Sequence, residues 1–252
     1  MKQIKEIYNR KFNEEWKSSL NVGSHDLGWQ YLQYYLAREK NTIEKKVLDL
    51  GCGNGQYSHM LLSHGMQNVF GIDLFEEAPF KEERFCYHQG DINQKLPYAD
   101  NFFDMVFTQS VLYYAVDLEK TIQEIKRILK PNGILYISGH TKYSIYTLSR
   151  RIKLKFRRKT VEHLQGVRFY PASYYEQVLK MNAFSILKVD GWGIYLFDTF
   201  FRICSGAAKV LHVKYKDPRK EICKNRIWCK FKSIVGYHFI VIGQNGGKEH
   251  DL

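Results

Sequence analysis

The stretch Lys46-Val47-Leu48-Asp49-Leu50-Gly51-Cys52-Gly53-Asn54-Gly55-Gln56-Tyr57 decides the fold of this chain. Its first half is largely apolar and suits a strand that is buried on both faces. Three glycines follow at alternate positions, and residues 57–64 then have the pattern of a helix. A strand, a glycine-rich turn and a helix together bring backbone N–H groups close to a nucleotide-like ligand in α/β folds. The stretch therefore predicts a ligand site at its glycine turn.

The spacing of the glycines narrows the class of ligand. It is G-x-G-x-G rather than the G-x-G-x-x-G of dinucleotide-binding proteins, because Gln56 stands where the third glycine would be. Asp49, just before the turn, would repel a pyrophosphate but could receive an ammonium group. These two features indicate a cationic, phosphate-free adenosine ligand.

Acidic residues end or follow the next two strands. The apolar run 68–72 ends at Asp73, and a carboxylate at that point can accept both hydroxyls of a ribose. A third strand is predicted at 84–88 and is followed by Asp91. Residues 103–108 form the fourth predicted strand, whose carboxyl end is the place where open α/β sheets carry ligand contacts.

The motifs, taken in order, resemble the class I S-adenosylmethionine (SAM)-dependent methyltransferases, and the methyltransferase type 11 group in particular. They are Val47-Leu48-Asp49-Leu50-Gly51-Cys52-Gly53-Asn54-Gly55, Gly71-Ile72-Asp73, Gly90-Asp91-Ile92, Phe103-Asp104-Met105-Val106 and Leu129-Lys130-Pro131-Asn132-Gly133. The match covers roughly residues 45 to 140. It implies a Rossmann-like three-layer α/β sandwich with a seven-stranded, mostly parallel sheet, an antiparallel last strand, and helical and basic insertions. It also implies SAM as cofactor and S-adenosylhomocysteine (SAH) as product.

The resemblance assigns the methionyl end of SAM to the glycine turn. Gly51, Gly53 and Gly55 would bring the backbone against this end of the cofactor. Asp49 would lie near its ammonium group, and Gln109 near the methionine moiety and the transferable methyl.

The resemblance assigns the adenosine end to the next two strands. Asp73 would take the ribose hydroxyls, with Leu74 beside the adenine. Asp91 would accept a hydrogen bond from the adenine amino group, and Ile92 would pack on the ring.

Methyl transfer requires little from the protein beyond positioning the cofactor and the acceptor. Transfer from a sulfonium is an in-line displacement, so positioning can supply ~7–11 kcal/mol of the barrier without a covalent residue. An oxygen nucleophile would still need a general base. His140, at the end of the fifth predicted strand (134–138), is the candidate by position, with Tyr113 or Tyr114 orienting the acceptor; a structural role for His140 stays open. No metal is expected, because no cluster of Asp, Glu and His falls at one strand end.

Charge is distributed unevenly along the 252 residues. The chain has a formal net charge of +12. Residues 1–139 carry a net −2 and residues 140–252 a net +14. This asymmetry indicates an anionic partner, such as a phosphorylated metabolite, a nucleic acid or a membrane surface. A basic, solvated surface is the other interpretation.

A single methyltransferase domain is expected over residues 1–252. Helices are expected within 1–44, the cofactor-binding core within 45–139, and substrate-side insertions at 140–170 and 194–236. Residues 145–156 have both helical and alternating periodicity, so either a basic amphipathic helix or a strand is open there. The helix after Asp117 is expected to stop at Pro131-Asn132-Gly133.

The remaining composition favours a cytoplasmic protein. No apolar run reaches the ~18 residues that span a bilayer. The first residues lack the apolar core of a signal peptide, and the five cysteines include no C-x-x-C pair.

Three acceptor classes fit these observations. The first is a small anionic, phosphorylated or nucleotide-linked molecule, methylated at oxygen. The second is RNA, with tRNA the most natural. The third is a lipid or quinone reached by peripheral contact with a membrane. The oligomeric state is not indicated.

Overall fold

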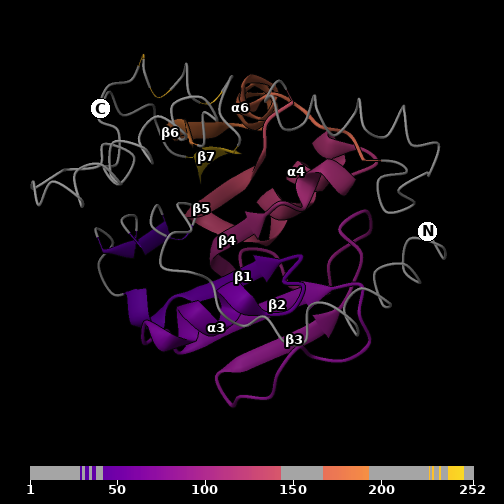
Figure 1. Cartoon of the computed structure of the whole chain (residues 1–252), viewed down its shortest axis with the longest axis vertical. Coiled ribbons are helices and arrows are strands. Elements are labelled where there is room, and N and C mark those ends of the chain that lie inside the picture. Colours follow the sequence, from indigo (N-terminus) through magenta and orange to yellow (C-terminus); the bar gives the residue numbers. More distant parts are fainter. Residues whose placement is uncertain are drawn as a thin grey trace, which may run out of the picture.

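The computed structural model of the chain is shown in Figure 1. The structure describes residues 42–142, 167–192 and 238–246, together with positions 29, 32, 33, 36, 37, 227, 229 and 233. The segment predicted at 145–156, and all of the 194–236 insertion except 227, 229 and 233, lie outside the described residues.

A seven-stranded sheet runs through the molecule. Its strands are β1 (Lys46–Leu50), β2 (Asn68–Asp73), β3 (Phe85–Gln89), β4 (Phe103–Gln109), β5 (Leu129–His140), β6 (Phe184–Trp192) and β7 (His238–Asn245). The order across the sheet is β3-β2-β1-β4-β5-β7-β6. The pairs from β3 to β5 are parallel, and β7 runs antiparallel to both β5 and β6. The predicted fold class is confirmed.

The boundary before β5 differs from the prediction. The helix was expected to stop at Pro131-Asn132-Gly133 and the strand to begin at residue 134, but the strand begins at Leu129. Leu129 pairs with Phe103, and the register then shifts before Met105 pairs with Ile134. Asn132 has a φ of 63°, which lets the three residues bulge out of the strand. The expectation was wrong because a bulge keeps both sides of the proline within one strand.

Helices cover both faces of the sheet, which gives the three layers (Figure 1). On one face, Leu61 and Leu62 of α3 (Gln56–Ser63) pack in one core cluster with Trp29 and with the inward residues of the sheet. On the other, α4 (Leu118–Ile128) and α6 (Ala172–Met181) pack in a second cluster. We call these sides the α3 face and the α4 face. Two short 3-10 helices, η2 (Thr42–Glu44) and η3 (Leu112–Tyr114), precede β1 and follow β4.

Alternation along the strands decides which side chains reach the α3 face. Val47, Phe107, Tyr136 and Ile240 belong to the α3-face cluster. Because successive side chains of a strand point to opposite faces, residues two positions away share that face. At the carboxyl edge of the parallel strands, this rule places six polar residues on the α3 face: Asp49, Asp73, Gln109, Ser138, His140 and His238.

No helix within the described ranges is long and apolar enough to cross a membrane. Asp117 caps α4 as predicted, since its carboxylate accepts a hydrogen bond from the backbone N–H of Lys120 at 3.2 Å.

The guanidinium of Arg127, near the end of α4, fastens the loop before β4. It donates to the carbonyl oxygens of Leu96 (3.2 Å) and Tyr98 (2.8 Å). It also pairs with Asp100 and, through two nitrogens, with Glu124. The ion pair lowers the pKa of Glu124, whose carboxylate also accepts from the backbone N–H of Leu96. One planar cation therefore satisfies two loop carbonyls and two carboxylates.

Replacing Arg127 should destabilise the protein measurably. We expect Arg127→Ala to lower the free energy of unfolding by about 2–4 kcal/mol, because it removes the donor from two loop carbonyl groups and the cation from the partly buried Glu124. Arg127→Lys should recover only part of this loss, because an ammonium cannot reproduce the planar fork. Urea denaturation measures both. Lys120→Ala is the control, since Lys120 is an exposed partner of Asp117 at 3.7 Å, and it should change stability by less than about 0.5 kcal/mol. An Arg127→Ala variant as stable as the control would contradict this role.

Candidate functional site

The backbone N–H groups of the glycine turn are mostly used within the protein. Donors to internal acceptors are Gly51, Cys52, Gly53, Gly55 and Gln56. Gly51 and Cys52 both donate to the carbonyl oxygen of Ile72, at 2.8 and 3.1 Å. A turn whose amides are already bonded does not cradle a phosphate group, which agrees with the phosphate-free ligand inferred from the sequence.

Two of the glycines are required by close packing as well as by backbone conformation. Gly51 has a φ of 77°, and a Cβ on it would lie 2.4 Å from a methyl carbon of Val111. Gly55 has a φ of 73°, and a Cβ there would lie 2.5 Å from the ring of Phe80. The turn therefore lies directly against the segment after β4 and the segment after β2.

Asp49 lies under the turn on the α3 face. It is 2% exposed, and its Oδ2 accepts a hydrogen bond from the Ser58 hydroxyl at 2.7 Å. Burial raises the pKa of Asp49 from its ordinary value of 3.8 to about 7, because the charged form loses hydration. A cation bound nearby would restore the charged form.

Asp73 connects the end of β2 to the turn. Its carboxylate accepts from the backbone N–H of Gly53 at 2.8 Å and of Leu74 at 2.7 Å. Desolvation nevertheless raises the pKa of Asp73. A carboxylate has about four lone-pair sites, so two remain for ribose hydroxyls.

The thiol of Cys52 is buried and lies in the electrostatic field of Asp49 and Asp73. Burial raises its pKa most, and the charges of Asp49 and Asp73 raise it further. Desolvation disfavours any charge, but the contribution of Asp49 and Asp73 to this shift would favour a positive group on a ligand. The turn is therefore an electrostatic match for a cationic cofactor.

The predicted adenine residues lie at the neighbouring strand end. The backbone N–H of Gly90 donates to the carbonyl oxygen of Asp73 at 2.8 Å, which brings the ends of β2 and β3 together. Asp91 Oδ1 accepts two hydrogen bonds from Asn93, one from its backbone and one from its side chain, both at 2.9 Å. Ile92 is partly buried against the α4-face cluster. Asp73, Leu74, Asp91 and Ile92 thus come from adjoining strand ends, as predicted.

Gln109 ends β4 on the same face as Asp49. It pairs in register with Ser138 of β5, and Ser110, the next residue, has a φ of 59°. Positive φ is uncommon for serine and marks a backbone held by its surroundings, here by a 2.7 Å hydrogen bond from Ser110 N to the Ser138 carbonyl oxygen. Gln109 Oε1 and Ser138 Oγ are buried and have no hydrogen-bond partner among the described residues.

The two predicted catalytic residues, His140 and Tyr113, lie near each other. Their ring centroids are 6.4 Å apart, and Tyr113 also contacts Tyr114 at 4.7 Å and Phe169 at 5.1 Å. Burial raises the pKa of Tyr113, whose hydroxyl is bonded to Ser110 and Tyr114. Tyr113 therefore stays a neutral phenol and can orient a substrate but not deprotonate it.

His238 is a neighbour of His140 that the sequence analysis missed. It begins β7 and pairs directly with His140, with ring centroids 4.3 Å apart. Burial, assisted by the nearby His140, lowers the pKa of His238 to about 3. His238 is therefore neutral at physiological pH. No sequence signal marks it, because the pairing arises only when β7 inserts between β5 and β6.

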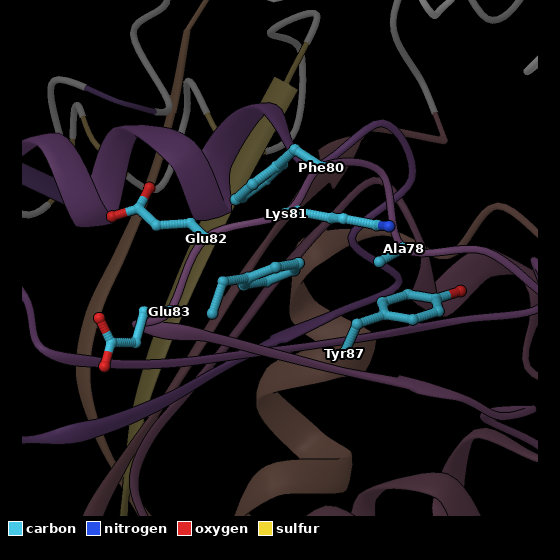
Figure 2. Close-up of a pocket in the computed structure, with 7 residues that line it drawn as sticks. Ala78, Phe80, Lys81, Glu82, Glu83 and Tyr87 are labelled. Carbon is cyan, nitrogen blue, oxygen red and sulfur yellow. The ribbon is translucent and has the colours of Figure 1, made fainter.

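A pocket of about 520 Å³ lies outside this set of residues. Figure 2 shows Glu82 and Glu83 at one end and Lys81 and Tyr87 at the other, below Phe80. Phe80 connects the pocket to the glycine turn through its approach to Gly55, but none of the predicted site residues lines it. Among the residues that the structure describes, no group of three or more His, Cys, Asp or Glu side chains could hold a metal ion.

The residues present fit a cationic adenosine cofactor. Most backbone N–H groups of the turn are already bonded and leave few donors for a phosphate, and the field of Asp49 and Asp73 favours a positive group. Gln109 Oε1 and Ser138 Oγ have no hydrogen-bond partner among the described residues and can accept hydrogen bonds from a ligand. SAM combines a phosphate-free adenosine, an ammonium group and a sulfonium.

Comparison with known sequences agrees with this geometry. The model of the methyltransferase domain family matches residues 48–137. The ubiquinone biosynthesis O-methyltransferase of Histophilus somni is 28% identical over 229 residues, which cover 85% of this chain and 77% of that protein. The tRNA U34 carboxymethyltransferase of Helicobacter acinonychis is 31% identical over 146 residues, 52% of this chain and 50% of that protein. The chain thus spans about half the length of this second relative.

Comparison with solved structures supports the fold. A methyltransferase in complex with the Trm112 methyltransferase activator of Haloferax volcanii has a TM-score of 0.63 and 19% identity, over 95% of this chain and 98% of that one. A SAM-dependent methyltransferase of Thermotoga maritima has a TM-score of 0.61 and 18% identity, over 97% and 100% of the two chains. The match to the domain family identifies residues 48–137 as a methyltransferase domain, and the chain as a whole shares its fold with solved SAM-dependent methyltransferases.

Proposed function

We propose that this methyltransferase acts on an oxygen atom of a small anionic, phosphorylated or nucleotide-linked acceptor. The observation that carries the proposal is the grouping of His140, Tyr113 and His238 at the carboxyl edge of the sheet, on the side of Gln109 away from the glycine turn. The acceptor would lie over β4 and β5 and approach the methyl group from there.

The roles of these residues follow from their protonation states. SAM supplies an activated methyl group on a good leaving group, so the protein must align the acceptor and remove its proton. His140 accepts the hydroxyl proton. Tyr113, a neutral phenol, orients the acceptor oxygen. His238 stays neutral beside His140.

The anionic character of the acceptor is supported by charge. Residues 140–252 carry a net +14, while the cofactor half is close to neutral. Basic residues attract and hold anionic groups through a field that salt screens. Methylation at oxygen is supported by the long match to an O-methyltransferase.

RNA is the second candidate acceptor. It is favoured by the relative that acts on tRNA and by the same basic half of the chain. Binding to single-stranded RNA should weaken with salt, with log K falling by ~0.7 for each phosphate neutralised. A metabolite with two phosphates should show a shallow dependence.

Methyl transfer from labelled SAM into fractionated extracts tests the proposal. Small-molecule, RNA and lipid fractions are incubated separately with the protein, and labelled products are identified. Label in an anionic metabolite, with a shallow salt dependence, is the expected result. Label only in RNA with a steep salt slope, or only in the lipid and quinone fraction, would overturn it.

His140→Gln should abolish most of the transfer to the acceptor recovered in that assay. Loss of a general base lowers kcat by about 10²–10⁴-fold, while SAM affinity should stay within about twofold because His140 lies beyond the cofactor residues. His64→Gln is the matched control, since His64 caps the far end of α3. Equal activity in the two variants would show that His140 is structural.

Asp73→Ala should weaken SAM and SAH binding by about 1.5–3 kcal/mol, the range for a charge-assisted hydrogen bond to the ribose. Calorimetry on a variant shown to be folded by circular dichroism measures this loss. Glu119→Ala, an exposed position on α4, controls for the removal of a carboxylate. Unchanged affinity would remove the ribose role from Asp73.

Asp49→Asn should stabilise the free protein at pH 8 and weaken its affinity for SAM. The pKa of Asp49 rises from 3.8 to about 7 on folding, so the folded state holds this proton more tightly. The shifted pKa of Asp49 contributes up to about 4 kcal/mol to the free energy of unfolding. This contribution is fully present below pH 4 and is lost as the pH rises to about 7. The asparagine variant lacks this loss, yet it provides no negative charge to attract the cofactor's ammonium group.

Thermal unfolding and calorimetry from pH 5 to 8 measure both effects. Wild-type affinity for SAM should increase with pH through about 7 as Asp49 ionises, and the variant should show a flat profile. Parallel pH profiles for the two proteins would contradict the assignment.

A further inference from the structure

Two paired residues at the carboxyl edge each have a buried side-chain oxygen atom without a hydrogen-bond partner among the described residues. These atoms are Gln109 Oε1 and Ser138 Oγ. The two residues are directly paired in the parallel register of β4 and β5, so their side chains share the α3 face. Ser138 is 2% exposed. Buried polar groups in native proteins are nearly always satisfied, so a donor from a ligand is the natural partner here.

The pair lies within reach of the glycine turn. The strand order β1-β4-β5 puts Ser138 two strand spacings, about 10 Å, from β1. The segment between is closely packed, because Val111 contacts Gly51 and Ser110 donates to the Ser138 carbonyl oxygen. A cofactor held by its ribose at β2 would extend its aminobutyryl chain along this edge, toward β4 and β5.

The charge at this edge selects the type of donor. Asp49, on the same face and one strand away from Gln109, provides negative charge once ionised. An amide oxygen accepts hydrogen bonds and a hydroxyl oxygen can also accept them, and an ammonium group brings three N–H donors. We propose that Ser138 is a further cofactor-binding residue, which together with Gln109 receives the ammonium group of the aminobutyryl chain.

The protein contains a matched control for this proposal. Thr108 precedes Gln109, is completely buried, and its hydroxyl is likewise without a partner among the described residues. Alternation points Thr108 to the α4 face, where it pairs with Ile137. Thr108 and Ser138 thus share burial and chemistry but face opposite sides of the sheet.

Calorimetry with two ligands tests the contact. SAH carries the aminobutyryl chain, and 5′-methylthioadenosine lacks it but keeps the nucleoside. Ser138→Ala should bind SAH roughly 10- to 100-fold more weakly and 5′-methylthioadenosine as wild type does. Ser138→Thr, which keeps the hydroxyl, should retain most of the SAH affinity. Thr108→Val should leave both affinities unchanged.

Thermal unfolding of the ligand-free variants supplies a second measurement. Removing a buried hydroxyl without a partner relieves its desolvation, so Ser138→Ala and Thr108→Val should both unfold a few degrees above wild type, roughly 2–4 °C. A Ser138→Ala protein that is more stable and yet binds SAH more weakly cannot owe its lost affinity to misfolding.

Three results would overturn the proposal. They are unchanged SAH affinity in Ser138→Ala, an equal loss for both ligands in that variant, or an equal loss of SAH affinity in Thr108→Val. The proposal rests on SAM as the cofactor, and that premise is tested separately by wild-type binding of SAH. It does not depend on the acceptor, because no acceptor is present in the experiment.

Discussion

The parallel pairing of β1 with β2 on one side and β4 on the other is the constraint on which the site depends. Parallel strands end at a common edge, so this pairing brings Asp49, Asp73 and Gln109 to one place although they lie far apart in the chain. The period of two then sends all three side chains to the α3 face. The hydrogen bond from Gly53 N to Asp73 fastens the turn across this pairing.

At this edge, features that lower the stability of the free protein are the same ones that favour binding of a cation or a hydrogen-bond donor. Asp49 is buried with a raised pKa, Asp73 has a raised pKa although it accepts two backbone hydrogen bonds, and two oxygens lack partners within the described residues. Each of these features is unfavourable in the free protein and is relieved by a cation or a donor. Binding energy that is unavailable to the free fold is thereby available to the cofactor.

The antiparallel insertion of β7 divides the edge into two regions. β1 and β2, with the ends of β3 and β4, carry the acids and backbone groups that we propose to hold the cofactor. β5 and β7 present the His140–His238 pair, in which His140 lies near the ring of Tyr113 from η3. β5 belongs to both regions, because it pairs parallel to β4 and antiparallel to β7, and we propose that its Ser138 serves the cofactor and its His140 the acceptor.

Local patterns in the sequence were sufficient for the strands and the glycine turn of the first half of the sheet. The apolar run before Gly51, the alternate glycines and the acids ending later strands are short-range signals, because a strand and the turn that follows it are contiguous in the chain. The acceptor half could not be derived in this way. The pairing of His140 with His238 joins residues 98 positions apart, and the bulge at Asn132 kept Pro131 inside a strand where a stop was expected.

The burial of the site residues likewise could not be predicted from the sequence and is decided by the tertiary structure. The sequence identified Asp49, Asp73 and Gln109 as site residues from position and resemblance. Only the tertiary structure decided that Asp49 is desolvated, that Ser138 pairs with Gln109 without a side-chain partner among the described residues, and that His238 is neutral. The physical reason is that desolvation and strand register depend on neighbours distant in sequence, whereas strands, turns and caps depend on neighbours within a few residues.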